Sequence, residues 1–68
     1  MKPGDFVYKS VRDEAVKKGA DLRIAENEAR ECFDIYRKNR FNGTVAQLLQ
    51  RHIAAAVKKS KDREKSTL

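Results

Sequence analysis

The sequence contains few of the residues that build cross-links, metal centres or catalytic sites. Among its 68 residues there are one cysteine, one histidine, one proline, three glycines and no tryptophan. One cysteine cannot form a disulfide within the chain, and one cysteine with one histidine is too small a set to enclose a zinc ion. We therefore predict no disulfide, no metal ion and no cofactor.

Long apolar segments are also lacking, which bears on membrane association. The longest apolar run, Ile53–Val57, is far shorter than the roughly 20 residues that a membrane-spanning helix needs. The start of the chain leads directly into mixed polar sequence, without the apolar segment of a secretory signal. We expect a cytoplasmic protein that does not enter a membrane.

Positive charge is abundant and unevenly distributed. The net charge is +6, and it divides into +2 over residues 1–19, −3 over residues 20–36 and +7 over residues 37–68. A basic half next to an acidic middle is typical of a protein that meets an anionic partner at one end. The alternative is a solvated surface followed by a disordered basic tail.

Two helices are marked by the residues at their ends. The pattern predicts a helix over residues 6–18, with Asp5 as its N-cap and Gly19 leaving it in the left-handed conformation. A longer helix is predicted over residues 22–40, with Asp21 as its N-cap. The apolar face of this second helix contains Leu22, Ala25, Ala29, Cys32, Phe33 and Tyr36.

A third helix begins at a capping box, in which the Thr44 hydroxyl and the Gln47 side chain satisfy backbone amides reciprocally. Its apolar stripe consists of Val45, Leu48, Leu49, His52, Ile53, Ala56 and Val57. The stripe ends near Lys59. From Ser60 onward apolar periodicity is missing, which indicates either a frayed helical extension or a disordered basic tail.

These elements predict an all-α fold, with one small three-helix domain over residues 1–59 and a flexible basic tail over residues 60–68. The turn at Asn42-Gly43 is short, so we expect the second and third helices to form a long antiparallel hairpin with the first helix packed across it. A chain of this length is near the lower limit for a single core, which favours marginal stability or a homodimer.

Few side chains could carry catalysis, and each has a structural interpretation. His52 lies on the apolar stripe, where we expect a partly buried, hydrogen-bonded imidazole. Cys32 lies on a packing face, where burial keeps a thiol unreactive. The acidic side chains of the second helix are expected on its solvated face, without the oxygen-rich loop that calcium prefers. They are Glu26, Glu28, Glu31 and Asp34. We predict no enzymatic activity.

The segment Tyr36–Phe41 brackets three cations between two aromatics. Cations contact phosphates and exposed aromatic rings stack on bases, so this combination favours nucleic acid. In the alternative interpretation, the aromatics belong to the core and the cations complete the helix end. The leading hypothesis is a nucleic-acid-binding or nucleic-acid-associated regulatory protein without catalysis. Its predicted binding residues are Arg37, Lys38, Arg40, Arg51, Lys58, Lys59 and Lys61, with Arg23 and Asn27 as weaker candidates for base contact.

The first two helices partly fit a helix-turn-helix motif. Ala15, Gly19 and Ala25 occupy the places where that motif needs a small residue, a turn glycine and an apolar residue. The fit fails at Glu14, Lys18 and Glu28, because they occupy places that usually face the core. A plain connection between helices accounts for the same glycine.

The second functional hypothesis is a helical protein–protein interaction module that does not contact nucleic acid. Ala54 and Ala55 broaden the apolar face of the third helix beyond what one neighbouring helix can cover. This excess favours a homodimer or an external protein partner that docks on apolar helix faces.

Overall fold

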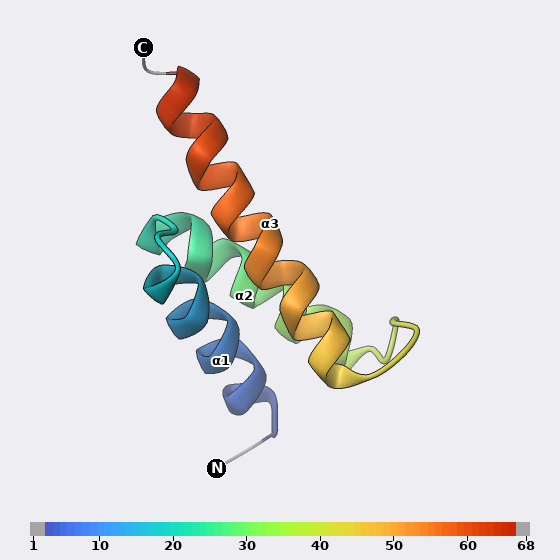
Figure 1. The fold of residues 1–68 in the computed structure, drawn as a ribbon. Helices are drawn as coiled ribbons and strands as arrows, with labels where there is room; N and C mark the ends of the chain where they lie inside the picture. Colours follow the sequence, from blue (N-terminus) through green and yellow to red (C-terminus); the bar gives the residue numbers. More distant parts are fainter. Residues whose placement is uncertain (1–2, 67–68) are drawn as a thin grey trace.

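The computed structural model describes the backbone of residues 3–66 and the side chains of residues 5–62. This part of the chain contains three α-helices and no strand (Figure 1). The helices are α1 (Pro3–Lys17), α2 (Leu22–Arg37) and α3 (Val45–Ser66). The predicted all-α, three-helix fold is confirmed. None of these helices is long and apolar enough to span a bilayer.

The first helix begins earlier than predicted. It starts at Pro3, so Asp5 lies in the first turn instead of capping the helix from outside. Proline suits the first helical position, because its φ is already helical and its missing N–H would have no partner within the helix. A carboxylate in the first turn interacts favourably with the helix dipole.

The turn between α1 and α2 is a Schellman motif centred on Gly19. The backbone N–H of Ala20 donates to the carbonyl of Ala15 at 2.9 Å, and the N–H of Gly19 donates to Val16 at 3.0 Å. Gly19 has φ of 103°, which confirms the predicted left-handed conformation.

The second helix ends in the same motif, three residues before the predicted end. Asn39 takes the left-handed position with φ of 54°, and the Arg40 N–H donates to the Ile35 carbonyl at 3.1 Å. Asparagine is one of the few residues other than glycine that adopts this conformation readily. The helix therefore stops at Arg37, and the connection to α3 occupies residues 38–44.

The capping box at the start of α3 is confirmed. The Thr44 hydroxyl accepts a hydrogen bond from the Gln47 N–H at 3.2 Å, and Gln47 Oε1 accepts one from the Thr44 N–H at 3.1 Å. Gly43 precedes it with φ of 92°, and a Cβ at that residue would collide with Gln47 Oε1. Both the glycine and the box are needed to start α3 at Val45.

The core lies where the three helices meet and is built from small side chains. Its buried apolar residues are Val7, Val11, Ala15, Ala20, Ala25, Ala29, Cys32, Leu48, Ile53 and Ala56. One predicted core residue is wrong, since Leu22 is 54% exposed. The buried face of α2 is centred on Ala25, Ala29 and Cys32, and Leu22 lies on the same side but at the first position of the helix, before this buried stretch.

Helix α3 continues to Ser66, past the predicted end of the apolar stripe near Lys59. Ser60, predicted to begin a flexible tail, is only 6% exposed. Its hydroxyl accepts a hydrogen bond from the Asp21 N–H at 2.8 Å and donates to the Ala56 carbonyl at 2.9 Å. The packed domain therefore includes Ser60. Residues 67 and 68 of the predicted tail lie outside the described residues.

Candidate functional site

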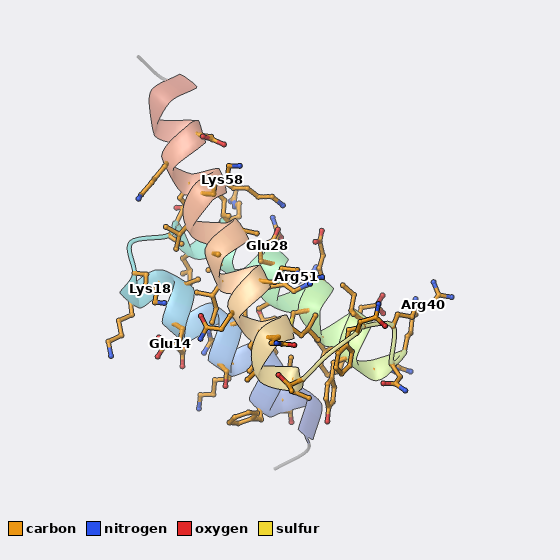
Figure 2. All side chains as sticks on the ribbon, turned by 45° about the vertical axis from the view of Figure 1, so that its right-hand side comes forward. Glu14, Lys18, Glu28, Arg40, Arg51 and Lys58 are labelled. Carbon is orange, nitrogen blue, oxygen red and sulfur yellow. The ribbon has the colours of Figure 1, made fainter. Side chains whose placement is uncertain are left out.

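The structure divides the predicted nucleic-acid-binding cations into two groups. We call Arg37, Lys38 and Arg40 the α2-end group, and Arg51, Lys58, Lys59 and Lys61 the α3 group; all seven are exposed. Figure 2 shows Arg40 beyond the end of α2, Arg51 on the middle of α3 and Lys58 further along that helix. The predicted cations therefore lie on two different parts of the fold.

The α2-end group lacks the free aromatic platform that the sequence suggested. The rings of Tyr36 and Phe41 stack on each other, with centroids 6.3 Å apart and planes 19° apart, and both are partly buried against the core. In addition, the Lys38 ammonium pairs with Asp34 at 3.2 Å. The aromatics of this segment thus serve the fold, which is the alternative interpretation given above.

The α3 group lies on a stretch of α3 that is basic up to Lys61 and is followed directly by Asp62. From Val45 to Lys61 there is no acidic residue in the sequence. Arg51, Lys58 and Lys61 are exposed on the side opposite the buried stripe, and Arg51 and Lys58 lie two helical turns apart. These cations have a fixed spacing because they lie on one helix.

Lys59 differs from the rest of the α3 group, because its ammonium forms an ion pair with the buried carboxylate of Glu28. This hydrogen bond raises the pKa of Lys59 above its ordinary value. Lys59 still has a side chain that is 58% exposed, so it lies at the border between interior and surface.

The weaker candidates Arg23 and Asn27 are exposed on α2. Asn27 lines a pocket together with Lys59, so the polar side of α2 adjoins the α3 group. Of the residues that fit the helix-turn-helix motif, Ala15 and Ala25 are buried and Gly19 is exposed at the turn. Docking of α2 into a groove of DNA stays a prediction.

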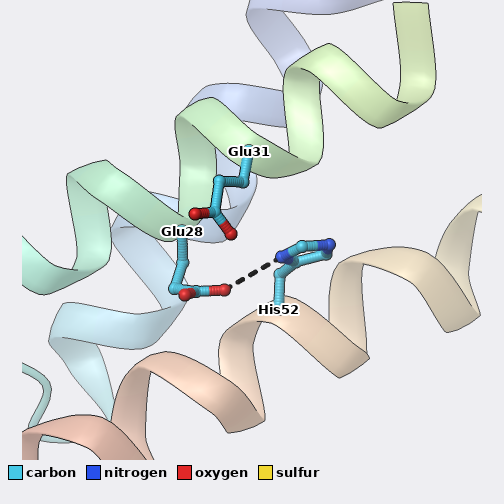
Figure 3. A group of neighbouring side chains, drawn as sticks. All are labelled: Glu28, Glu31 and His52. Carbon is cyan, nitrogen blue, oxygen red and sulfur yellow. Dashed lines mark hydrogen bonds and ion pairs between the residues drawn. The ribbon is translucent and has the colours of Figure 1, made fainter. Parts of the chain in front are cut away.

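Glu28 is the main residue that sequence reasoning placed wrongly. It was expected on the solvated face, yet it is only 3% exposed. Its Oε1 is 3.0 Å from His52 Nδ1 (Figure 3). Its Oε2 contacts the Lys59 ammonium. His52 is hydrogen-bonded, as predicted, and is buried more fully than expected. Spacing could have located Glu28, because it comes three residues after Ala25 and four before Cys32, two predicted core residues.

The buried carboxylate has clear electrostatic consequences. Burial acts to raise the pKa of Glu28, but hydrogen bonds and attraction from Lys59 and His52 outweigh it, so the pKa is lowered. Glu28 therefore keeps its negative charge inside the domain. Burial, followed by repulsion from that charge, raises the pKa of Cys32 to about 11. The prediction of a buried thiol is confirmed, since Cys32 is fully buried.

A shallow apolar groove lies along α3 beside the end of α1. Its floor contains Ile53, Ala54 and Val57. Three lysines and a glutamine surround this floor, namely Lys18, Gln50, Lys58 and Lys61. The groove therefore shares two cations with the exposed basic side of α3.

Comparisons of this chain with protein-family models, curated proteins and solved structures gave no match. Its function is therefore inferred from three local features. These are the α3 group, the lysine-rimmed groove, and the buried polar cluster around Glu28 and His52.

Proposed function

We propose that this protein binds nucleic acid, mainly through phosphate contacts made by the exposed side of α3, and acts by occupying a site. The observation that supports this proposal is the acid-free stretch from Val45 to Lys61, with Arg51, Lys58 and Lys61 exposed on one helix. Cations that neutralise phosphates release condensed counterions, which drives binding without base-specific contacts.

The geometry of α3 suits a charged strand. Arg51 and Lys61 lie about 15 Å apart along the helix axis, at a rise of 1.5 Å per residue. Successive phosphates on one strand of duplex DNA are about 3.4 Å apart along its axis, so this row faces several of them. The acidic segment over residues 20–36 would repel phosphates, which favours an approach by α3. Arg23 and Asn27 are kept as proposals for base contact.

The experiment compares two triple variants that remove the same charge from different places. One replaces Arg51, Lys58 and Lys61 by glutamine, and the other replaces the α2-end group by glutamine. Binding of a labelled duplex is measured by fluorescence anisotropy over a series of salt concentrations. Each lost phosphate contact removes roughly 0.9 from the slope of log affinity against log salt. We expect the α3 variant to flatten the slope by about 2–3 units.

The α2-end variant should change the slope less, because Lys38 already pairs with Asp34. Glutamine is nearly as good a helix former as lysine or arginine, so both variants should retain the helical circular dichroism signal. Equal slopes for both variants would contradict the assignment to α3. No binding by the unmodified protein at about 50 mM salt would contradict nucleic-acid binding itself.

The groove on α3 supports a second candidate function, the protein-interaction module. Its apolar floor and lysine rim complement an amphipathic helix with acidic flanks. Ala54→Leu would fill the groove without changing charge, so it should weaken binding of a designed acidic amphipathic peptide and leave the salt slope on DNA unchanged. Sedimentation of the purified protein would separately report a homodimer.

A further inference from the structure

Three side chains from two helices converge at the border of α2 and α3. Glu28 and Glu31 lie one turn apart on α2, and His52 faces them from α3 (Figure 3). One potential ligand atom from each lies within 4.8 Å of the other two. Two carboxylate oxygens and an imidazole nitrogen form a donor set that zinc and neighbouring divalent metals accept. We propose that this cluster binds one divalent transition-metal ion, for which Zn²⁺ is the test case.

The distances suit a shared ion. Zinc bonds of about 2.0–2.2 Å in a tetrahedral arrangement place the ligand atoms roughly 3.3–3.6 Å apart. His52 Nδ1 and Glu28 Oε1 are 3.0 Å apart, so an ion bound to both would replace their hydrogen bond, and the Glu28 carboxylate would turn away from the Nδ1 axis to admit it. Glu31 is exposed, and one of its carboxylate oxygens lies within 4.8 Å of the other two ligand atoms. Two of the three ligands are thus held in place by burial and packing.

Lys59 is compatible with the ion because it uses the other oxygen of the same carboxylate. Its ammonium contacts Glu28 Oε2, which leaves Oε1 for the metal. In this arrangement Lys59 orients Glu28 from outside the coordination shell, as outer-shell partners commonly do. Lys59 and Arg30 also line the neighbouring pocket and balance the two carboxylates. The affinity for a metal ion therefore comes mainly from direct bonds to the ligand atoms and not from net negative charge. An imidazole nitrogen suits zinc and its neighbours, whereas Mg²⁺ and Ca²⁺ prefer oxygen ligands.

Access to the cluster comes from the same pocket. Ile24, Asn27, Glu28, Arg30, Glu31 and Lys59 line it, and Glu31 lies at its exposed side. Three protein ligands leave a fourth zinc position for water. Because α2 and α3 each contribute ligands, a bound ion would also cross-link the two helices and stabilise the folded state.

The test is a titration of the full chain with Co²⁺, whose visible absorption reports tetrahedral coordination, followed by displacement with Zn²⁺. Glu31→Gln removes one ligand at an exposed position and should not disturb folding. Glu14→Gln removes the same charge from an exposed position on α1 and serves as the matched control. We expect one saturable site in the unmodified chain and in the control, and at least about a tenfold loss of affinity in Glu31→Gln.

Thermal unfolding provides a second measurement. Zn²⁺ should raise the midpoint of the unmodified chain and of Glu14→Gln, and should raise that of Glu31→Gln much less at the same concentration. A chain that shows no saturable Co²⁺ or Zn²⁺ binding would overturn the proposal. Equal affinity in Glu31→Gln and in the unmodified chain would also overturn it, because the ion would then be held elsewhere.

Discussion

Replacing Glu28 with glutamine tests whether the buried carboxylate stabilises the domain through its charge. Glutamine has almost the same shape and can still accept a hydrogen bond from His52. It cannot form an ion pair with Lys59, whose side chain is exposed enough to return to water. The variant therefore removes the negative charge while it keeps the packing of α2 against α3.

The expected loss can be estimated from the contacts. Hydrogen bonds to charged groups contribute roughly 1.5–3 kcal/mol each. In the variant the bond to His52 is kept in a weaker form, and the bond that is lost, to Lys59, has a partner that is exposed to solvent. We therefore expect Glu28→Gln to lower the free energy of unfolding by about 1–3 kcal/mol at neutral pH.

The loss should depend on pH in a defined direction. Lys59 and His52 hold the pKa of folded Glu28 below its ordinary value of 4.5. A lowered folded pKa means that the charge contributes stability above about pH 4.5, and that this contribution disappears as pH falls through the folded pKa. Between the two pKa values the unmodified protein should lose up to about 1.4 kcal/mol per pH unit from this group. The difference between the two proteins should therefore shrink in acid.

Urea unfolding followed by circular dichroism, repeated from neutral to acidic pH, measures this difference. Glu14→Gln again controls for the removal of one negative charge at an exposed position. A stability difference between Glu28→Gln and the unmodified protein that stays constant down to about pH 2 would refute the role assigned to the charge. If Glu14→Gln showed the same pH-dependent loss of stability as Glu28→Gln, the effect would not be specific to the buried carboxylate of Glu28.

Three further outcomes follow from single residues. Ser60→Ala should destabilise the domain by about 1–3 kcal/mol, because a part-buried N–H before α2 loses its acceptor, whereas Lys61→Ala should change the urea midpoint little. Gly43→Ala should cost about 1–2 kcal/mol or more, since it strains φ and displaces Gln47 from the capping box; an unchanged thermal midpoint would exclude that geometry. Cys32 should react with a chromogenic thiol reagent only after addition of urea, because it is fully buried and its pKa is about 11; complete labelling of the folded protein within seconds would contradict this.

The local features of the fold could be predicted from neighbouring residues. Gly19 and Gly43 mark backbone positions with positive φ, and Thr44 with Gln47 marks a helix start. Each of these signals acts over a few residues, so its physical cause is contained in the sequence around it. The same holds for the buried faces of the helices, which follow from the spacing of small and apolar residues. The early end of α2 at Asn39 was missed because tolerance of the left-handed conformation by asparagine is a weaker signal than glycine.

Other features depend on partners that are distant in the chain. Glu28 is buried because His52 and Lys59, 24 and 31 residues away, satisfy its oxygens, and composition alone places a glutamate on the surface. Ser60 belongs to the domain because it accepts an N–H 39 residues earlier. The sequence by itself determined three helices, the left-handed glycine after α1, the capping box of α3 and a basic C-terminal half. Tertiary packing decided which charges are buried and which are exposed together, because a charged side chain can enter the interior only where another helix supplies its partner.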